Sequence, residues 1–257
     1  MKIIAVVNQK GGVGKTTTSV NLATSLASIH KKVLLVDLDP QGNASTGVGE
    51  FQRNNINGTY EFLLGLKPME ACIHKTKIPS LWLASASTNL AGAEVELVSL
   101  PKREYKLRDA LMHEGKDFDY ILIDCPPALG LMTVNALTAA DEVLVPLQCE
   151  FYALDGLARL IETIRRVKTH FNKALKLSGI VLTMYDKRSA LSAQVEADAR
   201  YHFRDKVFNT VIPRSVRVSE APSHGQPVVL YDFQNAGSMA YMKLAGEMLK
   251  REMVANG

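Results

Sequence analysis

Short hydrophobic runs recur along the chain, and most are followed by a turn or by a stretch with helical spacing. Several of these runs are apolar at every position, which is typical of parallel strands that are covered on both faces. The runs that predict strands lie at residues 3–7, 33–36, 81–84, 120–123, 142–146 and 178–183.

Between these runs, apolar residues recur every three or four positions, which indicates amphipathic helices. The predicted helices span residues 16–28, 59–65, 91–100, 105–113, 131–139, 154–171, 189–203 and 239–253. Alternating strands and helices predict an α/β fold with an open, doubly wound, mostly parallel sheet and helices on both faces. No linker and no internal repeat divides the chain, so we expect residues 1–257 to form one domain.

The composition is that of an ordinary globular protein, with 47% hydrophobic and 22% charged residues. No apolar run approaches the roughly 20 residues that cross a bilayer. The first eight residues are too short for a signal peptide, and the three cysteines lie far apart and are odd in number. These features predict reduced thiols and a cytoplasmic location.

The strongest chemical signal follows the first predicted strand. Residues 9–15 are rich in glycine and lead into the helix predicted from residue 16. A strand, a glycine-rich loop and a helix in this order are the context of a phosphate-binding P-loop. Gly11, Gly12 and Gly14 allow the backbone to curl, so that successive N–H groups converge on phosphate oxygens.

Three side chains next to these glycines complete the predicted nucleotide site. Lys15 places an ammonium group on the β- and γ-phosphates, and the Thr16 hydroxyl is the expected magnesium ligand. Thr17 is placed to hydrogen-bond the α-phosphate. The predicted ligands are therefore ATP and Mg²⁺.

Carboxylates follow two of the predicted strands. Asp37 and Asp39 come after residues 33–36, and Asp124 comes after residues 120–123. Ligands of such sheets bind at the carboxyl ends of the strands, so one carboxylate can serve the magnesium ion while another orients the attacking water. A helix cap or an Asx turn before Pro40 is the structural alternative for Asp37. Asp124 fits the Walker B pattern of a magnesium-binding aspartate.

One position departs from the usual P-loop pattern. Gln9 stands where a glycine is expected, and Lys10 precedes the glycines. With this K-G-G-x-G-K-T-T form, the deviant Walker A loop, the sequence resembles the ParA/MinD family of P-loop ATPases. The resemblance implies that Lys10 reaches across a homodimer to the partner's nucleotide. The predicted nucleotide-binding residues of the loop are Lys10, Gly11, Gly12, Val13, Gly14, Lys15, Thr16 and Thr17.

The resemblance also assigns the acidic residues. It makes Asp39 the hydrolytic residue of a switch, together with Lys10 and Lys15, and it places Asp37 nearer the metal ion. Thr16, Asp37 and Asp124 are then the predicted magnesium residues.

Four longer segments resemble the chromosome-type ParA/Soj proteins that partition DNA. They lie at residues 39–43, 146–154, 182–186 and 212–222. By this resemblance Met184, Pro213 and Arg214 flank the adenine. The P-loop begins near residue 10, so no N-terminal helix-turn-helix domain is expected.

The charge is unevenly distributed. The chain carries a net +4, but residues 159–217 hold 13 Lys and Arg against 5 Asp and Glu, a local net charge of +8. A polyanion partner or a solvated helix face would each explain this excess. The resemblance favours non-specific double-stranded DNA, bound by Arg188 and Arg217. The weaker DNA-binding candidates are Arg214, Lys243, Lys250 and Arg251.

Together these resemblances imply a nucleoid-associated ATPase with weak intrinsic activity. An ATP-bound dimer would hold DNA until a ParB-type partner stimulates hydrolysis, which would move or position a ParB-bound chromosome or plasmid locus. A ParA-like ATPase that positions another cargo shares every residue named above.

Three other classes fit less well. A MinD-like membrane-cycling regulator needs a lipid-binding C-terminal helix, but the apolar residues within 241–253 have the spacing of a helix packed on the core, so no membrane partner is expected. An iron–sulfur reductase needs paired thiolates. A ligase on the same fold, such as a cobyrinate amidase relative, would need an additional substrate domain.

Overall fold

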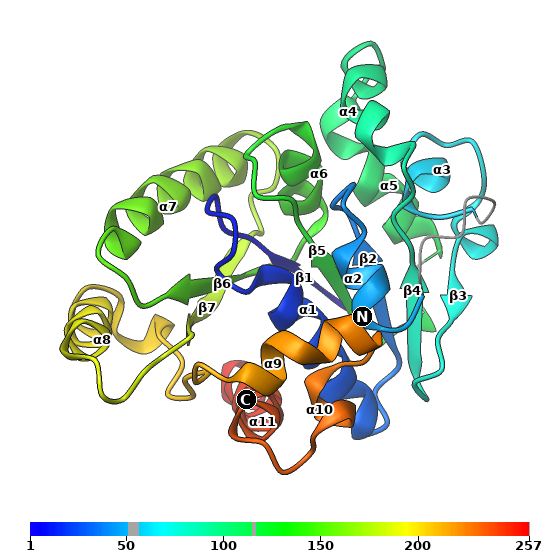
Figure 1. Cartoon of the computed structure of the whole chain (residues 1–257). Coiled ribbons are helices and arrows are strands. Elements are labelled where there is room, and N and C mark those ends of the chain that lie inside the picture. Colours follow the sequence, from blue (N-terminus) through cyan, green and yellow to red (C-terminus); the bar gives the residue numbers. More distant parts are fainter. Residues whose placement is uncertain (51–56, 115–116, 257) are drawn as a thin grey trace.

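The structure, a computed structural model, describes residues 1–50, 57–114 and 117–256. At its centre these residues form a seven-stranded sheet in the order β3-β4-β2-β5-β1-β6-β7 (Figure 1). Every neighbouring pair is parallel except β3 and β4, which are antiparallel. The strands are β1 (Lys2–Val6), β2 (Val33–Asp37), β3 (His74–Lys75), β4 (Leu81–Ala84), β5 (Tyr120–Asp124), β6 (Glu142–Gln148) and β7 (Lys176–Thr183).

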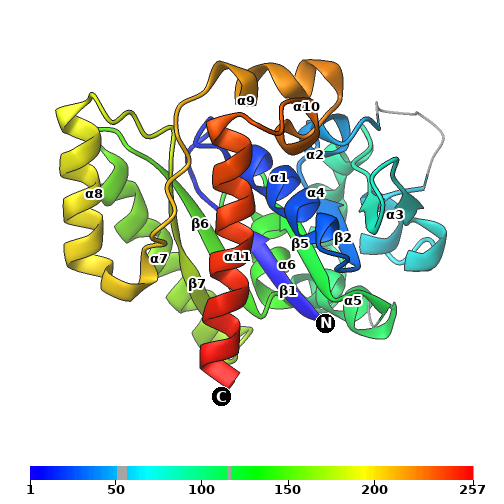
Figure 2. The same ribbon diagram turned by 90° about the horizontal axis from the view of Figure 1, so that it is seen from below.

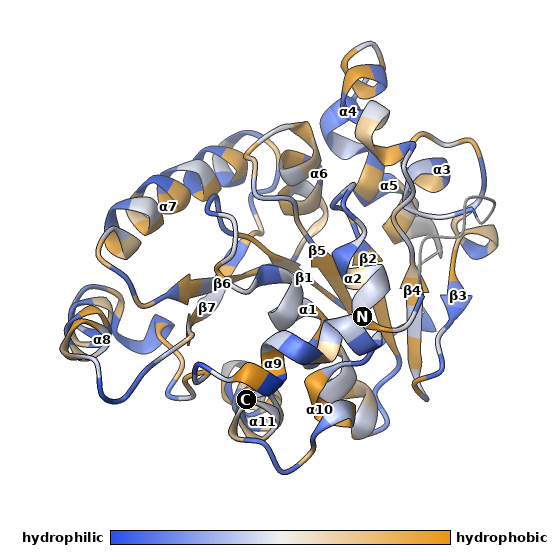
Figure 3. Ribbon diagram, in the orientation of Figure 1, coloured by the Kyte–Doolittle hydropathy of each residue, from blue (hydrophilic) through white to orange (hydrophobic). Residues whose placement is uncertain are grey.

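The central strands consist mainly of hydrophobic residues (Figure 3), and buried clusters cover both faces of the sheet, as the uninterrupted hydrophobic runs predict. In β1 the side chains of Ile3 and Ala5 join one buried cluster, whereas those of Ile4 and Val6 join another. Successive side chains of a strand point to opposite faces. Two layers of helices are therefore needed to keep the sheet from water.

One layer packs on the face that carries Ile4 and Val6, and α11 runs along it (Figure 2). It contains α1 (Lys15–Ser28), α2 (Asn43–Gly47), α10 (Val228–Tyr231) and α11 (Ala236–Asn256). The other layer contains α3 (Thr59–Leu63), α4 (Leu90–Val98), α5 (Lys106–Glu114), α6 (Leu131–Ala139), α7 (Ala153–His170) and α8 (Ala190–Phe203). None of the described helices is both long and apolar enough to cross a bilayer.

The predicted fold class is confirmed, and the predicted strands and long helices are present with ends shifted by a few residues. Within the described residues, the elements that the pattern missed are short. These are β3, α2, α9 (Val216–Glu220), α10 and several single 3₁₀ turns. Elements this short span too few residues to show a helical or strand period.

The topology collects five loops at one edge of the sheet. Strands β1, β2, β5, β6 and β7 are parallel, so their carboxyl ends lie on the same side. The register also pairs Asp37, at the end of β2, with Asp124, at the end of β5. The P-loop and the predicted acidic residues therefore meet at this edge.

Candidate functional site

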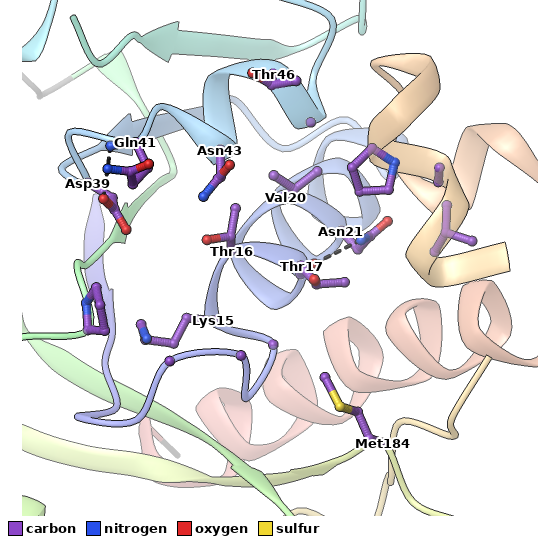
Figure 4. Close-up of a pocket in the computed structure, with 18 of the residues that line it drawn as sticks. Lys15, Thr16, Thr17, Val20, Asn21, Asp39, Gln41, Asn43, Thr46 and Met184 are labelled. Atoms are coloured by element: carbon purple, nitrogen blue, oxygen red, sulfur yellow. Dashed lines mark hydrogen bonds between the residues drawn. The ribbon is translucent and has the colours of Figure 1, made fainter. Parts of the chain in front are cut away.

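A cavity of about 460 Å³ opens where these loops meet (Figure 4). Figure 4 shows Lys15, Thr16 and Asp39 toward one end and Met184 apart from them. The loop after β1 and helix α1 contribute Gly11, Gly12, Gly14, Lys15, Thr16, Thr17, Val20 and Asn21. The remaining walls are Asp39, Gln41, Asn43, Thr46, Gly47, Pro127, Met184, Ala221, Pro222, Gln226 and Val228.

The phosphate loop is closed by two glycines in the left-handed region. Gly12 has φ +76° and Gly14 has φ +88°, which side chains with a Cβ rarely adopt. Helix α1 begins directly afterwards at Lys15, and the Thr18 N–H donates to the Gly14 carbonyl at 2.9 Å. The unpaired N–H groups of the first turn therefore border the cavity, which suits anionic phosphate groups.

Neighbouring strands fix the loop through contacts that the sequence did not reveal. Asn8 donates from Nδ2 to the Pro146 carbonyl at 2.7 Å and accepts from the Lys10 N–H at 3.1 Å. The Thr183 hydroxyl donates to the Val13 carbonyl at 2.8 Å. Val13 itself is buried and does not line the cavity. Its contribution to the site is the carbonyl that accepts this hydrogen bond from Thr183.

The Lys15 ammonium points back into the loop and donates to the Lys10 carbonyl at 3.0 Å. Burial lowers the pKa of Lys15, while Asp124 and Asp39 oppose that shift. A buried ammonium group is stabilised by nearby anions. Lys15 lines the cavity, and its role on the phosphates stays a prediction.

Thr16 and Asp124 lie together, as the magnesium prediction requires. The Thr16 hydroxyl donates to Asp124 Oδ2 at 2.8 Å, and the Ser19 hydroxyl donates to Oδ1 at 2.8 Å. Burial, followed by the charge of Asp37, raises the pKa of Asp124 to about 7. Ser19 is a second partner that the sequence did not reveal.

Asp37 and Asp39 have different surroundings. Asp37 is fully buried and accepts from the Ser45 N–H at 2.8 Å and the Ser45 hydroxyl at 2.7 Å, so it holds the start of α2. Burial raises its pKa to about 6. Asp39 lines the cavity and accepts from the Gln41 N–H at 3.0 Å through Oδ1. The Asp39 N–H also donates to Asp37 Oδ1 at 3.3 Å, which is the Asx turn considered as the structural alternative, and the role of Asp37 beside a metal ion stays a prediction.

The oxygen donors at this end of the cavity fit a magnesium ion. Mg²⁺ prefers oxygen ligands and is usually held by one or two carboxylates together with substrate phosphates. Among the described residues no three His, Cys, Asp or Glu side chains are grouped to hold a metal ion. The Thr16 hydroxyl and phosphate oxygens would therefore complete the coordination shell of the magnesium ion. A cation would favour the ionised form of Asp124 and so oppose burial and the charge of Asp37, which raise its pKa.

The far end of the cavity contains one of the three predicted adenine residues. Met184 lines it, whereas Pro213 and Arg214 do not. Pro213 instead forms a parallel bridge with Tyr185, and the Arg214 N–H donates to the Tyr185 carbonyl at 3.0 Å. Ala221, Pro222, Gln226 and Val228, from the short segments around α10, were not predicted.

Lys10 lies outside its own cavity. Its ammonium forms an ion pair with Glu150, from the loop after β6, and its side chain is 56% exposed. Glu150 is thus a partner that the sequence did not identify. The role of Lys10 toward a second protomer stays a prediction.

Both predicted DNA-binding arginines are exposed, and both contact carboxylates. Arg188 donates to both oxygens of Asp186, each at 3.1 Å, and its side chain is 90% exposed. Arg217 lies 3.1 Å from Glu220 and 3.6 Å from Asp232.

Two of the weaker DNA-binding candidates, Arg214 and Arg251, have different surroundings in the structure. Arg214 is exposed, and its charge helps to lower the pKa of Asp186, an effect due mainly to hydrogen bonds from Arg188. Arg251 instead donates to the Asp205 and Val207 carbonyls, each at 2.9 Å, and packs on the Phe208 ring. Arg251 therefore serves mainly to hold α11.

Comparisons with known proteins identify the family of the chain. The profile of a family described as an AAA domain matches residues 1–177. The chain is 53% identical to the chromosome partitioning protein ParA of Caulobacter vibrioides, over 98% of this chain and 95% of that protein. It is 51% identical to the sporulation initiation inhibitor protein Soj of Bacillus subtilis, over 100% and 99% of the two chains.

A solved structure shares the fold at similar length. It is described as cobyrinic acid a,c-diamide synthase from Mycobacterium smegmatis with bound ADP and magnesium. It is 37% identical, with a TM-score of 0.87 over 98% of this chain and 96% of that chain. Chain length therefore does not separate this protein from a structure with that name, whereas the identity to the ParA and Soj relatives is higher.

The sheet order, the phosphate loop and the acidic residues at the strand ends define a P-loop ATPase. Within that class, the full-length similarity shows that the chain belongs to the ParA/Soj family of chromosome-partitioning ATPases.

Proposed function

We propose that this ATPase is a nucleotide-controlled switch that partitions DNA. Two ATP-bound protomers form a homodimer in which each Lys10 enters the partner's nucleotide site. The observation that carries the proposal is that Lys10 belongs to the phosphate loop but does not line its own cavity. A cation at that rim can stabilise transition-state charge in a second copy, as arginine fingers do.

Within one protomer, different residues bind the phosphates, hold the metal ion and orient the attacking water. The first turn of α1 and Lys15 bind the β- and γ-phosphates, and Thr16, with Asp124 behind it, would hold Mg²⁺. The bound ion supplies charge neutralisation on the phosphate oxygens. Asp39 orients the attacking water, because its Oδ2 makes no hydrogen bond with the described part of the chain while Oδ1 is fixed by Gln41.

The dimer would bind non-specific double-stranded DNA through Arg188 and Arg217 of both copies. Such contacts reach phosphates rather than base edges, so binding should weaken steeply with salt. A ParB-type centromere-binding protein would stimulate hydrolysis and release the dimer. The chain would then cycle on the nucleoid as one domain without a membrane-bound stage.

The C-terminal helix supports the absence of a membrane stage. In α11 the side chains of Tyr241, Leu244 and Met248 are at most 1% exposed. They pack against the cluster that covers one face of the sheet. An amphipathic helix that binds lipid must expose its apolar face, and this face is used inside the protein.

Gel-shift assays at low salt, with and without ATP and Mg²⁺, test the proposal. Wild-type protein should retain DNA only with ATP. Lys10→Ala should bind ATP yet fail to dimerise or retain DNA, and Arg217→Glu should dimerise without retaining DNA. DNA retention that is equal with ATP, with ADP and without nucleotide would refute the nucleotide switch.

A further inference from the structure

Helix α6 begins without a side-chain cap of its own. Its N-cap residue is Gly130, which has no side chain to accept a hydrogen bond, and its first turn contains no acidic residue. The first four N–H groups of a helix have no partner within the helix. An acceptor for these groups therefore has to come from another part of the chain or from water.

Glu94 supplies such an acceptor from a different helix. It lies on α4, next to α6 (Figure 1), and its Oε1 accepts from the Leu131 N–H at 2.6 Å. A carboxylate at the start of a helix satisfies a free donor and also interacts favourably with the helix dipole. Glu94 and Leu131 are 37 positions apart, so this cap joins α4 to α6 through the tertiary fold alone.

Gly130 leaves the space that this carboxylate occupies. A Cβ at position 130 would overlap with Glu94 Oε1. The backbone of Gly130 is extended, with φ −80° and ψ −167°, a conformation that other residues also adopt. The absent side chain, rather than the backbone conformation, is therefore what allows Glu94 to reach the start of α6.

The residues before α6 contribute to a wall of the nucleotide cavity. The chain leaves β5 at Asp124, whose carboxylate accepts from the Thr16 hydroxyl, and Pro127 lines the cavity three residues later. Asp124 thus fixes the near end of residues 125–130 beside the phosphate loop. Glu94 fixes their far end.

The position of α4 is itself tied to the loop after β2. In the connection from β4 to α4, the Ala86 N–H donates to the Ser45 hydroxyl oxygen at 3.2 Å, and that hydroxyl donates to Asp37. One side of α4 packs in a buried cluster through Leu90, Ala93 and Leu97. Helix α4 therefore relates the loop that carries Asp39 to the loop that follows Asp124.

We propose that Glu94 is a positioning residue for ATP hydrolysis, which caps α6 from α4 and so holds residues 125–130 in place beside Asp39 and the phosphates. The inference rests on the hydrolysis in the proposed function and adds what keeps the loop after β5 in position. Small displacements within a catalytic site reduce its rate strongly. ATP binding is assigned to the loop after β1 and the first turn of α1, which are separate from this cap. Loss of the cap should therefore lower turnover and leave ATP affinity unchanged.

A double-mutant cycle tests the assignment. Glu94→Ala removes the acceptor, Gly130→Ala displaces the flexible carboxylate with a methyl group, and a third variant combines both. Glu94→Gln keeps an acceptor oxygen. Glu94 is exposed, so these changes leave the buried core intact. The matched control is Glu96→Ala, which removes the same charge from the same helix but contacts the Tyr60 hydroxyl instead.

Four measurements are made on each variant. Phosphate release at saturating ATP and Mg²⁺ gives turnover, titration gives ATP affinity, and thermal unfolding reports folding. Hydrogen exchange of the segment that contains Leu131 reports the cap directly.

Glu94→Ala and Gly130→Ala should each lower turnover about fivefold, the factor that corresponds to one lost side-chain cap, with ATP affinity unchanged. The segment that contains Leu131 should exchange faster in both. The double variant should lose no more turnover than either single variant, because both changes remove the same contact. Glu94→Gln should retain most of the turnover, and Glu96→Ala should match wild-type protein.

Equal turnover of Glu94→Ala and wild-type protein would overturn the assignment and leave the proposed function standing. Losses that add in the double variant would also overturn it, because Glu94 and Gly130 would then act independently. If Glu94→Ala does not fold, the comparison of Gly130→Ala with Glu94→Gln decides in the same way. DNA retention that does not depend on nucleotide would remove the proposed switch without affecting Glu94. A wild-type protein that does not hydrolyse ATP would refute both.

Discussion

The hydrogen bond between Thr183 and Val13 allows a sharp test of how the phosphate loop is held. It joins β7 to the loop over 2.8 Å, and the Thr183 side chain is 2% exposed. Valine has nearly the same shape as threonine but no hydroxyl. Thr183→Val therefore removes the donor while leaving the volume of the site almost unchanged.

The substitution should lower the free energy of unfolding measurably, because the Val13 carbonyl would remain buried without this donor. An unsatisfied buried acceptor costs about 1–3 kcal/mol, so a central value near 2 kcal/mol is expected for unfolding. For a chain of this size that corresponds to a fall in Tm of roughly 4–8 °C. ATP affinity should fall as well, because the loop loses one of its anchors.

Thr138→Val is the matched control. Thr138 is 1% exposed, but its hydroxyl has no hydrogen-bond partner in the described part of the chain. Removing it should leave the Tm unchanged or raise it. Thermal unfolding by circular dichroism and ATP titration would measure both variants. If Thr183→Val unfolds and binds ATP like Thr138→Val, the loop does not depend on this anchor.

Further predictions concern the phosphates, the water and the DNA surface. Lys15→Ala should weaken ATP binding by roughly 10- to 100-fold, measured by titration, since a charge-assisted hydrogen bond to phosphate is lost. Asp39→Ala should keep ATP binding but lose about 100-fold or more in turnover, measured by phosphate release; normal turnover would remove it from catalysis. Glu220→Gln should raise DNA affinity roughly two- to fivefold per protomer by freeing Arg217, whereas Glu162→Gln on α7 serves as the control. Equal DNA affinity for both glutamine variants would show that the carboxylate does not restrain the arginine.

The sequence predicted those parts of the fold that depend on local patterns. Continuous apolar runs marked the buried parallel strands, and the glycines marked a tightly curled loop, in which the structure places Gly12 and Gly14 in the left-handed region. Lys15, Thr16 and Asp39 were placed in the cavity by the same reasoning.

Contacts between distant segments could not be predicted in this way. The Asn8–Pro146 and Thr183–Val13 bonds join residues 138 and 170 positions apart. No local spacing reports such pairs. The wall formed by Ala221, Pro222 and Gln226 was missed because short helices show no period.

The sequence was equally incomplete as a guide to which basic residues are available for DNA. Basic residues are visible in a sequence, but their partners are not. Arg251 shows this most clearly, because carbonyl groups and an aromatic ring occupy its guanidinium group inside the fold.

The position of β1 has a consequence for how the protein is made. Among the seven described strands β1 comes first along the chain, yet it lies between β5 and β6, so neither of its neighbours exists until residues 120–124 and 142–148 have been translated. The wall formed by Gln226 and Val228 comes later still. The complete phosphate-loop sequence is therefore translated long before the strands and the cavity wall that surround it in the folded protein.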